Sequence, residues 1–316
     1  MKRVLLSTFP SAFLHQGGGE REILLLNDAL NAAGVMSDVF GPTSKSIATY
    51  GTLVHFSMAK GSEYIIDDAA AAGIKLILWP NLWFVNEPST AQIAYVRGLL
   101  SRFDAIVFRS LSEEKHFNKY LDTSGLDVIH VAPLISPRFL SEFESDIFRE
   151  SYSLKDYVIW PGIIEPQKNQ LTAVRAFKGL PFDLVLSGTV RDQSYMRQCM
   201  DEADENVLFI PPMPFGSELH LSALRSSRLF LELPLDFPGS SALEASAMGC
   251  RLMLSRTEWT QEMLGDVCSQ VDPTDVIDVR ESLLRCSEYW DSPRRAPQKY
   301  APLTDAVAPL VEYLVR

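Results

Sequence analysis

The chain has 316 residues, 47% of them hydrophobic and 22% charged, which is typical of a globular protein with two domains of ~150 residues each. Its net charge of −11 argues against a protein that mainly binds nucleic acid and predicts at most peripheral contact with a membrane, because both partners need clustered Lys and Arg. The four cysteines are scattered, so we expect neither a zinc site nor a disulfide framework and predict a cytoplasmic location. No apolar stretch reaches the ~20 residues of a membrane span.

Strands and helices are predicted to alternate through the first half of the chain. Residues 4–7 form a short apolar strand, and the glycines at 17–19 open a helical pattern that ends at Gly34, as expected for a glycine just past a helix. Further strands are predicted at 38–40, 53–56, 76–79 and 105–108. Because these strands are almost wholly apolar, they predict a parallel sheet covered by helices on both faces.

The second half repeats this scheme after a segment, 133–152, that is rich in Ser, Pro and charge and predicts an interdomain linker. Strands are predicted at 157–160, 184–186, 207–210, 229–233 and 251–255. Helices are predicted at 168–177, 191–200, around 222–226, after residue 240 and again at 304–316. The doubled pattern therefore predicts an α/β protein with two domains.

The turn between Asp236 and Glu244 carries the clearest functional signal. Gly239, Ser240 and Ser241 follow a predicted buried strand and begin a helix, where free backbone N–H groups favour a phosphate. The two acids flank this turn and can accept hydrogen bonds from sugar hydroxyls. Either acid alone would be explained by the helix dipole, but the glycine-serine turn between them predicts a site for a nucleotide sugar.

Six segments, in order along the chain, resemble the retaining glycosyltransferases of family 4, which have the GT-B fold. The segments are Gly17-Gly18-x-Glu20, residues 131–139, residues 161–169 with Gly162 and Lys168, Gly188 and the residues after it, residues 206–219, and residues 236–249, which resemble the family motif E-x(7)-E. Three positions depart from the family pattern: Asp236 replaces the first Glu, Ile163 replaces an Arg, and Gly188-Thr189-Val190 replaces G-x-G.

The resemblance implies two Rossmann-like parallel-sheet domains that face each other across a cleft. The first, at 1–140, would be the acceptor-side domain, on which the helix at 304–316 packs back, and the second, at 150–303, would bind the nucleotide sugar. The implied reaction moves a sugar from a nucleoside-diphosphate sugar to a carbohydrate or another hydroxyl acceptor with retention of the anomeric configuration. No metal or other cofactor is expected, because side-chain cations and helix N-termini can stabilise the leaving diphosphate.

The resemblance also assigns roles to individual residues. Asp236, Lys168 and Glu244 are the predicted catalytic residues, which would hold the donor sugar, the diphosphate and the ribose, respectively. Lys168 is predicted at a helix start, where a cation is unfavourable and a ligand therefore expected. The predicted donor-binding residues are Gly17, Gly18, Gly162, Lys168, Gly188, Arg191, Gly239, Ser240, Ser241 and Glu244. Two histidines, His15 and His55, are predicted on the acceptor side, although packing alone would explain His55.

Three alternatives remain open at this point. Ile163 in place of the usual Arg suggests a non-catalytic subunit that binds carbohydrate or nucleotide. A nucleotide-sugar epimerase of similar fold would need a group of acids and a histidine that the sequence does not reveal. A nicotinamide dehydrogenase is disfavoured because no G-x-G-x-x-G follows a predicted strand.

Overall fold

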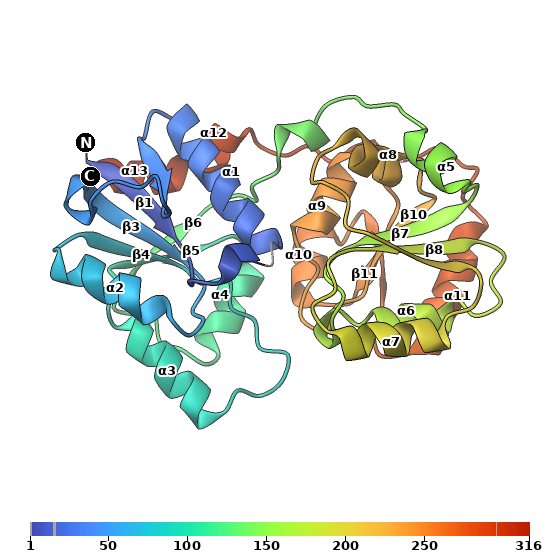
Figure 1. The fold of residues 1–316 in the computed structure, drawn as a ribbon, viewed down its shortest axis with the longest axis horizontal. Helices are drawn as coiled ribbons and strands as arrows, with labels where there is room; N and C mark the ends of the chain where they lie inside the picture. The colour runs from blue at the N-terminus through green and yellow to red at the C-terminus, as the bar shows by residue number, and fades with distance from the viewer. Residues whose placement is uncertain (1, 15–16, 295) are drawn as a thin grey trace. The chain divides into compact units, whose positions relative to one another are not determined.

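The computed structural model describes residues 2–14, 17–294 and 296–316. The chain divides into two compact units, one formed by Met1–Leu134 with Ala301–Arg316 and the other by Ile135–Tyr300 (Figure 1). Each unit contains a six-stranded sheet in which all paired strands are parallel. This arrangement confirms the predicted α/β class with a parallel sheet in each half.

The sheet of the first unit has the strand order β2-β1-β3-β4-β5-β6. Its strands are β1 (Arg3–Ser7), β2 (Ser37–Val39), β3 (Tyr50–Phe56), β4 (Lys75–Trp79), β5 (Ala105–Phe108) and β6 (Asp127–His130). Its helices are η1 (Ala12–Leu14), α1 (Gly18–Ala32), η2 (Ile47–Thr49), α2 (Ser62–Ala71), α3 (Thr90–Leu100), α4 (Leu111–Asn118), α12 (Leu303–Ala306) and α13 (Ala308–Val315). β3, β4 and β5 are buried almost throughout, as their continuous apolar sequences predicted.

The apolar stripe of α1 covers one face of this sheet. Ile23, Leu26 and Leu30 are buried at helical spacing in one cluster with the side chains of β1. Gly34 has a left-handed φ of +83°, which glycine adopts without steric cost, so the helix ends where the sequence predicted.

The segment after residue 300 completes this same cluster. Leu310 and Tyr313 of α13 pack into it, and the Tyr313 hydroxyl donates to Asp127 Oδ2 at 3.0 Å. The single helix predicted at 304–316 is instead two short helices that are separated at Val307. Pro309 in the first turn of α13 explains this break, because it has no N–H group with which to continue a helix from α12.

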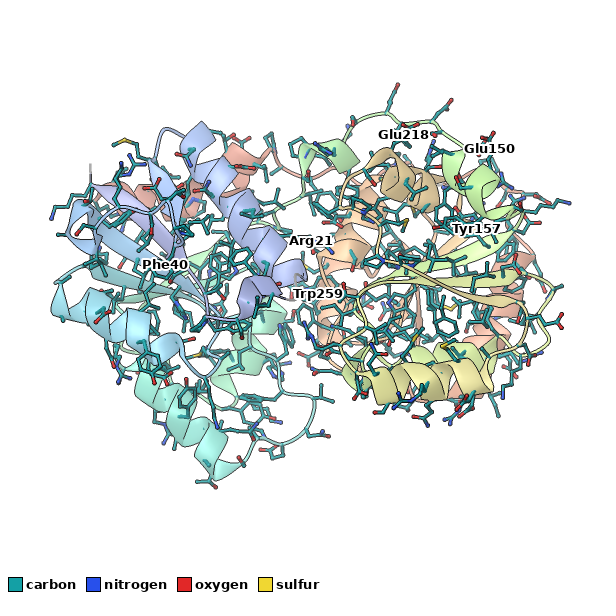
Figure 2. All side chains as sticks on the ribbon, in the orientation of Figure 1. Arg21, Phe40, Glu150, Tyr157, Glu218 and Trp259 are labelled. Carbon is teal, nitrogen blue, oxygen red and sulfur yellow. The ribbon has the colours of Figure 1, made fainter. Side chains whose placement is uncertain are left out.

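The sheet of the second unit has the strand order β12-β11-β10-β7-β8-β9. Its strands are β7 (Tyr157–Pro161), β8 (Asp183–Ser187), β9 (Val207–Ile210), β10 (Leu229–Glu232), β11 (Leu252–Ser255) and β12 (Cys268–Val271). Its helices are η3 (Pro137–Phe139), α5 (Ile147–Tyr152), η4 (Pro166–Lys168), α6 (Gln170–Ala176), α7 (Gln193–Glu202), α8 (Glu218–Ser226), α9 (Ser240–Ala247), α10 (Glu258–Leu264) and α11 (Val276–Ser287). Figure 2 shows Tyr157 inside this unit, whereas Glu150 and Glu218 lie at its surface.

Two features of the second unit differ from the sequence prediction. The segment expected as a linker is folded into the unit, where Phe148 of α5 is fully buried and the Ser222 hydroxyl donates to the Ser145 carbonyl at 2.7 Å. The helix predicted from residue 191 begins at 193, because the Asp192 carboxylate accepts hydrogen bonds from the N–H groups of its first turn.

The order of the strands creates one switch point in each sheet. β1 lies between β2 and β3, and β7 lies between β8 and β10, so the connections on the two sides of these strands run in opposite directions. In open parallel sheets, ligands bind outside the carboxyl ends of the strands at such a point. Among the described helices none is both long and apolar enough to cross a lipid bilayer.

Candidate functional site

The predicted residues of the second unit gather at its switch point. The loops after β7, β8 and β10 carry Gly162 to Lys168, Gly188 to Arg191, and Asp236 to Ser241, and these three strands are neighbours in the sheet. Because parallel strands end at the same edge, residues far apart in sequence meet there. The fold thus brings most of the predicted donor-binding residues to one edge of one sheet.

Lys168 and Asp236 form an ion pair at this edge. Lys168 Nζ lies 3.2 Å from Asp236 Oδ1, and the side chains are 24% and 9% exposed, so both charges are partly shielded from water. Gln167 adds a hydrogen bond from its side-chain amide to Asp236 Oδ2 at 3.1 Å. Its backbone carbonyl also accepts from the N–H group of Leu235 at 3.0 Å. The loops after β7 and β10 are therefore held together by charge and by hydrogen bonds.

The position of Lys168 corrects one expectation. It does not begin a helix: it is the last residue of η4, and α6 starts two residues later. Asn169 separates the two helices with a left-handed φ of +62°, and its side-chain amide donates to the carbonyls of Leu233 at 3.1 Å and Pro273 at 2.6 Å. The charge of Lys168, one residue before the N-cap of α6, is balanced by Asp236.

Glu232, the last residue of β10, belongs to this site and was not predicted from the sequence. Its side chain is buried and accepts a hydrogen bond from the Ser241 hydroxyl at 2.9 Å. Burial raises the pKa of Glu232 to about 7, while the nearby charge of Lys168 acts in the opposite direction. Glu232 could have been recognised in the sequence as an acidic residue within the apolar run 229–235, because a buried strand seldom carries an acid without a partner.

The start of α9 lacks a side-chain cap. Gly239 is its N-cap residue and has no side chain to accept from the first-turn N–H groups, whereas α7, α8, α10 and α11 in the same unit each begin with a capping side chain. Ser240 and Ser241 therefore present backbone N–H groups of the kind that bind anions. Glu244 lies one turn further on with its side chain buried, and its contact with a ribose stays a prediction.

Gly188 is required by the close approach of two loops. A Cβ atom at this position would lie 1.6 Å from the carbonyl oxygen of Gly162, which is far inside any van der Waals contact. The two loops are also joined by a hydrogen bond of 2.8 Å from the Gly162 N–H group to the Ser187 carbonyl. The absence of a side chain at Gly188 is therefore what allows the loops after β7 and β8 to lie together.

Arg191 has a protein partner in the structure. Its guanidinium lies 3.0 Å from the Glu165 carboxylate, and the arginine side chain is 46% exposed. An exposed pair of this kind contributes little to stability. The role of Arg191 as a second phosphate contact stays a prediction, and it requires the arginine to exchange or share its partner.

The remaining predicted residues belong to the first unit. Gly17 and Gly18 stand at the start of α1, where the Gly17 N–H group donates to Glu20 Oε2 at 2.7 Å. His55 is fully buried in β3, its Nδ1 lies 2.8 Å from the Ser7 hydroxyl, and burial lowers its pKa to about 4, so the imidazole is neutral at pH 7. His15 lies outside the described residues. Among the residues described, no three His, Cys, Asp or Glu side chains are grouped so that they could hold a metal ion.

The sequence matches no protein-family model and no curated protein. Solved structures similar to this one include sucrose-phosphate synthase from Thermosynechococcus elongatus, with a TM-score of 0.75, 15% identity and coverage of 92% of this chain and 91% of that one. Another is HepE from Anabaena in complex with UDP and glucose, with a TM-score of 0.75, 13% identity and coverage of 98% and 94%. A third is the UDP-GlcNAc 2-epimerase from Neisseria meningitidis bound to UDP-GlcNAc, with a TM-score of 0.58, 12% identity and coverage of 100% of both chains. These likenesses show that the chain has the GT-B fold, which consists of two Rossmann-like α/β domains.

Proposed function

We propose that this protein is a glycosyltransferase that moves a sugar from a nucleoside-diphosphate sugar to a hydroxyl group of an acceptor, with retention of the anomeric configuration and without a metal ion. The observation that carries the proposal is the ion pair of Lys168 and Asp236 beside the uncapped start of α9. It gives one sheet edge a cation, anion-binding N–H groups and a carboxylate, which are the groups that a diphosphate and a sugar need.

The costly step of such a transfer is the departure of the diphosphate with the electron pair of the broken bond. Lys168 and the N–H groups of Ser240 and Ser241 stabilise the charge that develops on it. Because these groups are already in place before the reaction, little reorganisation is needed when the charge appears. Side chains and helix dipoles then supply the positive charge, which is why we propose a reaction without a metal.

The carboxylates of Asp236 and Glu244 recognise different parts of the donor. Asp236 accepts hydrogen bonds from hydroxyls of the transferred sugar, while Lys168 is shared between Asp236 and the diphosphate. Glu244 accepts from the ribose hydroxyls. Glu232 lies beneath the turn and, through its hydrogen bond with Ser241, holds the start of α9 in the orientation that faces the diphosphate.

Similar structures support a nucleotide-sugar donor. HepE was solved with UDP and glucose, and in a separate structure with UDP-glucose, at TM-scores of 0.75 to this chain. The fold is shared with the UDP-GlcNAc 2-epimerase of Neisseria meningitidis, so epimerisation is the second candidate.

The test is a transfer and hydrolysis assay with UDP-, GDP-, ADP- and dTDP-sugars, in which NMR follows the anomeric configuration of the product. We expect release of one nucleoside diphosphate in the presence of a chelator. Lys168→Ala should lower turnover by about 100-fold, as is typical when one transition-state donor is lost. Arg191→Ala is the comparison, because it removes the cation of the neighbouring loop, and the larger loss of turnover identifies the loop that stabilises the leaving group.

Three other outcomes would each reject part of the proposal. If Arg191→Ala abolishes transfer while Lys168→Ala keeps it, the leaving group is stabilised from the loop after β8 instead. A change at the sugar carbon next to the anomeric centre without any acceptor would identify an epimerase. Tight binding of a nucleotide sugar without turnover in any assay would identify a non-catalytic binding protein.

A further inference from the structure

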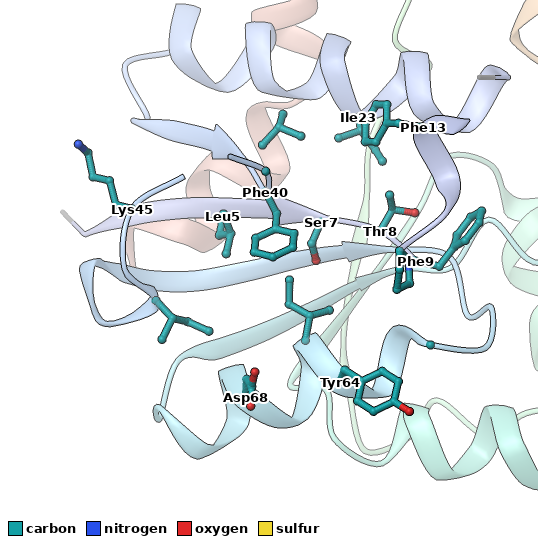
Figure 3. Close-up of a pocket in the computed structure, with 16 residues that line it drawn as sticks. Leu5, Ser7, Thr8, Phe9, Phe13, Ile23, Phe40, Lys45, Tyr64 and Asp68 are labelled. Carbon is teal, nitrogen blue, oxygen red and sulfur yellow. The ribbon is translucent and has the colours of Figure 1, made fainter. Parts of the chain in front are cut away.

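The first unit contains a pocket to which the proposed function assigns no ligand. Its volume is about 660 Å³, within the range of pockets that bind drug-sized molecules. It lies outside the carboxyl ends of β1 and β2, next to the switch point of this sheet, and α2 closes its lower side in Figure 3. Ligand pockets of open α/β sheets are found at this kind of position.

Exposed aromatic side chains are concentrated around this pocket. Phe13, Phe40 and Tyr64 all line it and are 38%, 56% and 73% exposed, respectively. Among the described residues, Tyr289 of the second unit is the only other aromatic residue with comparable exposure. Apolar surface gathered in one concave place, rather than scattered, marks a binding site because its removal from water is favourable.

The polar groups of the lining are few and carry no net charge. One cation, Lys45, and one anion, Asp68, line the pocket, and both are exposed. Ser7 is different, because it is buried at the end of β1 and hydrogen-bonded to the neutral imidazole of His55 at 2.8 Å. A hydroxyl group can make more than one hydrogen bond, so Ser7 can also pair with one hydroxyl of a ligand.

The loop that carries Phe40 and Lys45 is held in place by hydrogen bonds and an ion pair. The Lys45 N–H group donates to the buried Tyr50 hydroxyl at 2.9 Å, and this hydroxyl donates to Asp38 Oδ2 at 3.1 Å. Asp38 is in turn paired with Arg3 at 2.7 Å. The pocket wall is therefore formed before any ligand arrives, which reduces the entropic cost of binding.

We propose that this pocket binds one neutral molecule with a fused or linked aromatic ring system that carries a hydroxyl group. Rings would lie against the aromatic side chains of Phe13, Phe40 and Tyr64, and the hydroxyl would pair with Ser7. A free sugar fits poorly, because most of its hydroxyls would be buried without partners against this apolar lining. The inference concerns the first unit alone and does not depend on the nucleotide site.

Calorimetric titration of the whole protein with naphthol as the probe tests this proposal, with decanol and glucose as comparison compounds. We expect naphthol to bind at one site per chain and more tightly than decanol, and glucose not to bind. Phe40→Asp should weaken naphthol binding by at least about tenfold, and Tyr64→Ala should also weaken it, because each removes aromatic contact area. Both side chains are exposed, so these variants should fold normally, which circular dichroism checks.

The matched control is Tyr289→Ala, which removes an equally exposed aromatic side chain from the second unit and should leave naphthol binding unchanged. The proposal is overturned if naphthol does not bind at millimolar concentration, if decanol binds more tightly, or if Tyr289→Ala weakens binding as much as Phe40→Asp. Binding of UDP-glucose to Phe40→Asp tests the nucleotide site separately. Unchanged binding shows that the substitution does not disturb the nucleotide site, whether or not naphthol binding changes.

Discussion

Each unit has a buried titratable side chain at a corresponding place in its sheet. His55 lies in β3 and Glu232 ends β10, and each of these strands follows the crossover and pairs with the first strand of its unit. Each side chain is hydrogen-bonded to a serine, Ser7 or Ser241. Next to Ser7, the strand ends of the first unit line an apolar pocket, whereas those around Glu232 in the second unit form a charged site. Similar sheet edges can therefore be specialised for different ligands by their loops.

The largest effect is expected where two loops approach most closely. Gly188→Ala would place a Cβ atom 1.6 Å from a backbone oxygen that belongs to Gly162, so the backbone itself must move. We expect the second unit to lose at least about 4 kcal/mol of stability. Gly98→Ala is the control: it lies in α3, nothing stands within 4 Å of its Cβ, and it should stabilise the first unit by roughly 0.5–1 kcal/mol. Hydrogen exchange, measured by mass spectrometry on peptides of each unit, reports the two stabilities separately. Wild-type exchange rates in Gly188→Ala would contradict the close approach.

The next prediction concerns the sign of the pH dependence around Glu232. Its pKa is about 7 in the folded protein against the ordinary value of 4.5, so between these values only the folded protein keeps the proton. The stability of the second unit should therefore fall as pH rises from 4.5 to 7, by roughly 3 kcal/mol. Glu232→Gln, which cannot ionise, should remove this slope in hydrogen exchange of the β10 peptide. A slope that persists in the variant would assign the effect to another group.

His55 gives the opposite expectation in the first unit. Its pKa is about 4 in the folded protein against the ordinary value of 6.5, so below pH 6.5 the unfolded chain takes up a proton that the folded protein does not. Stability should fall as pH is lowered from 6.5 to 4, again by roughly 3 kcal/mol. The β3 peptide should show this slope in the wild type and lose it in His55→Gln. If both units respond to pH in the same direction, the contrast between them is wrong.

The smallest effect distinguishes the two acids of the proposed nucleotide site. Glu244→Gln should weaken the binding of a bare nucleoside diphosphate by about 1.5–3 kcal/mol, because it removes a charged hydrogen-bond acceptor from the ribose. Asp236→Asn should weaken it less, because the sugar that Asp236 would hold is absent from this ligand. Isothermal titration measures both affinities, and equal losses would reject the assignment of ribose to Glu244 and sugar to Asp236.

The central strands of both sheets could be predicted from the sequence, whereas only one of the two edge strands of each sheet could, namely β2 and β9. β5 and β10 are continuous apolar runs because both faces of a parallel sheet are covered, and such runs are recognisable. The edge strands β6 (Asp127–His130) and β12 (Cys268–Val271) were missed, because they are partly exposed and therefore carry polar residues. The left-handed backbone of Asn169 was not predictable either, because the hydrogen bonds of its side chain join segments that are distant in sequence.

The candidate site could also be predicted only in part. The neighbourhood of Lys168 and Asp236 followed from motifs at the ends of strands that were predicted as parallel. Their direct contact depends on η4, where the sequence pattern predicted the start of a longer helix instead. The pocket of the first unit left no motif, because its lining comes from several elements, each of which supplies only one or a few side chains.

The return of residues 301–316 to the first unit has a consequence for biosynthesis. A ribosome makes Met1–Leu134 long before α13, whose residues Leu310 and Tyr313 close the core of that unit. Until then the apolar surface that they cover stays exposed and is a place where chaperones can bind. The second unit, in contrast, is one continuous stretch that can complete its core as soon as it emerges. We therefore expect the first unit, although it is synthesised first, to complete its folding last.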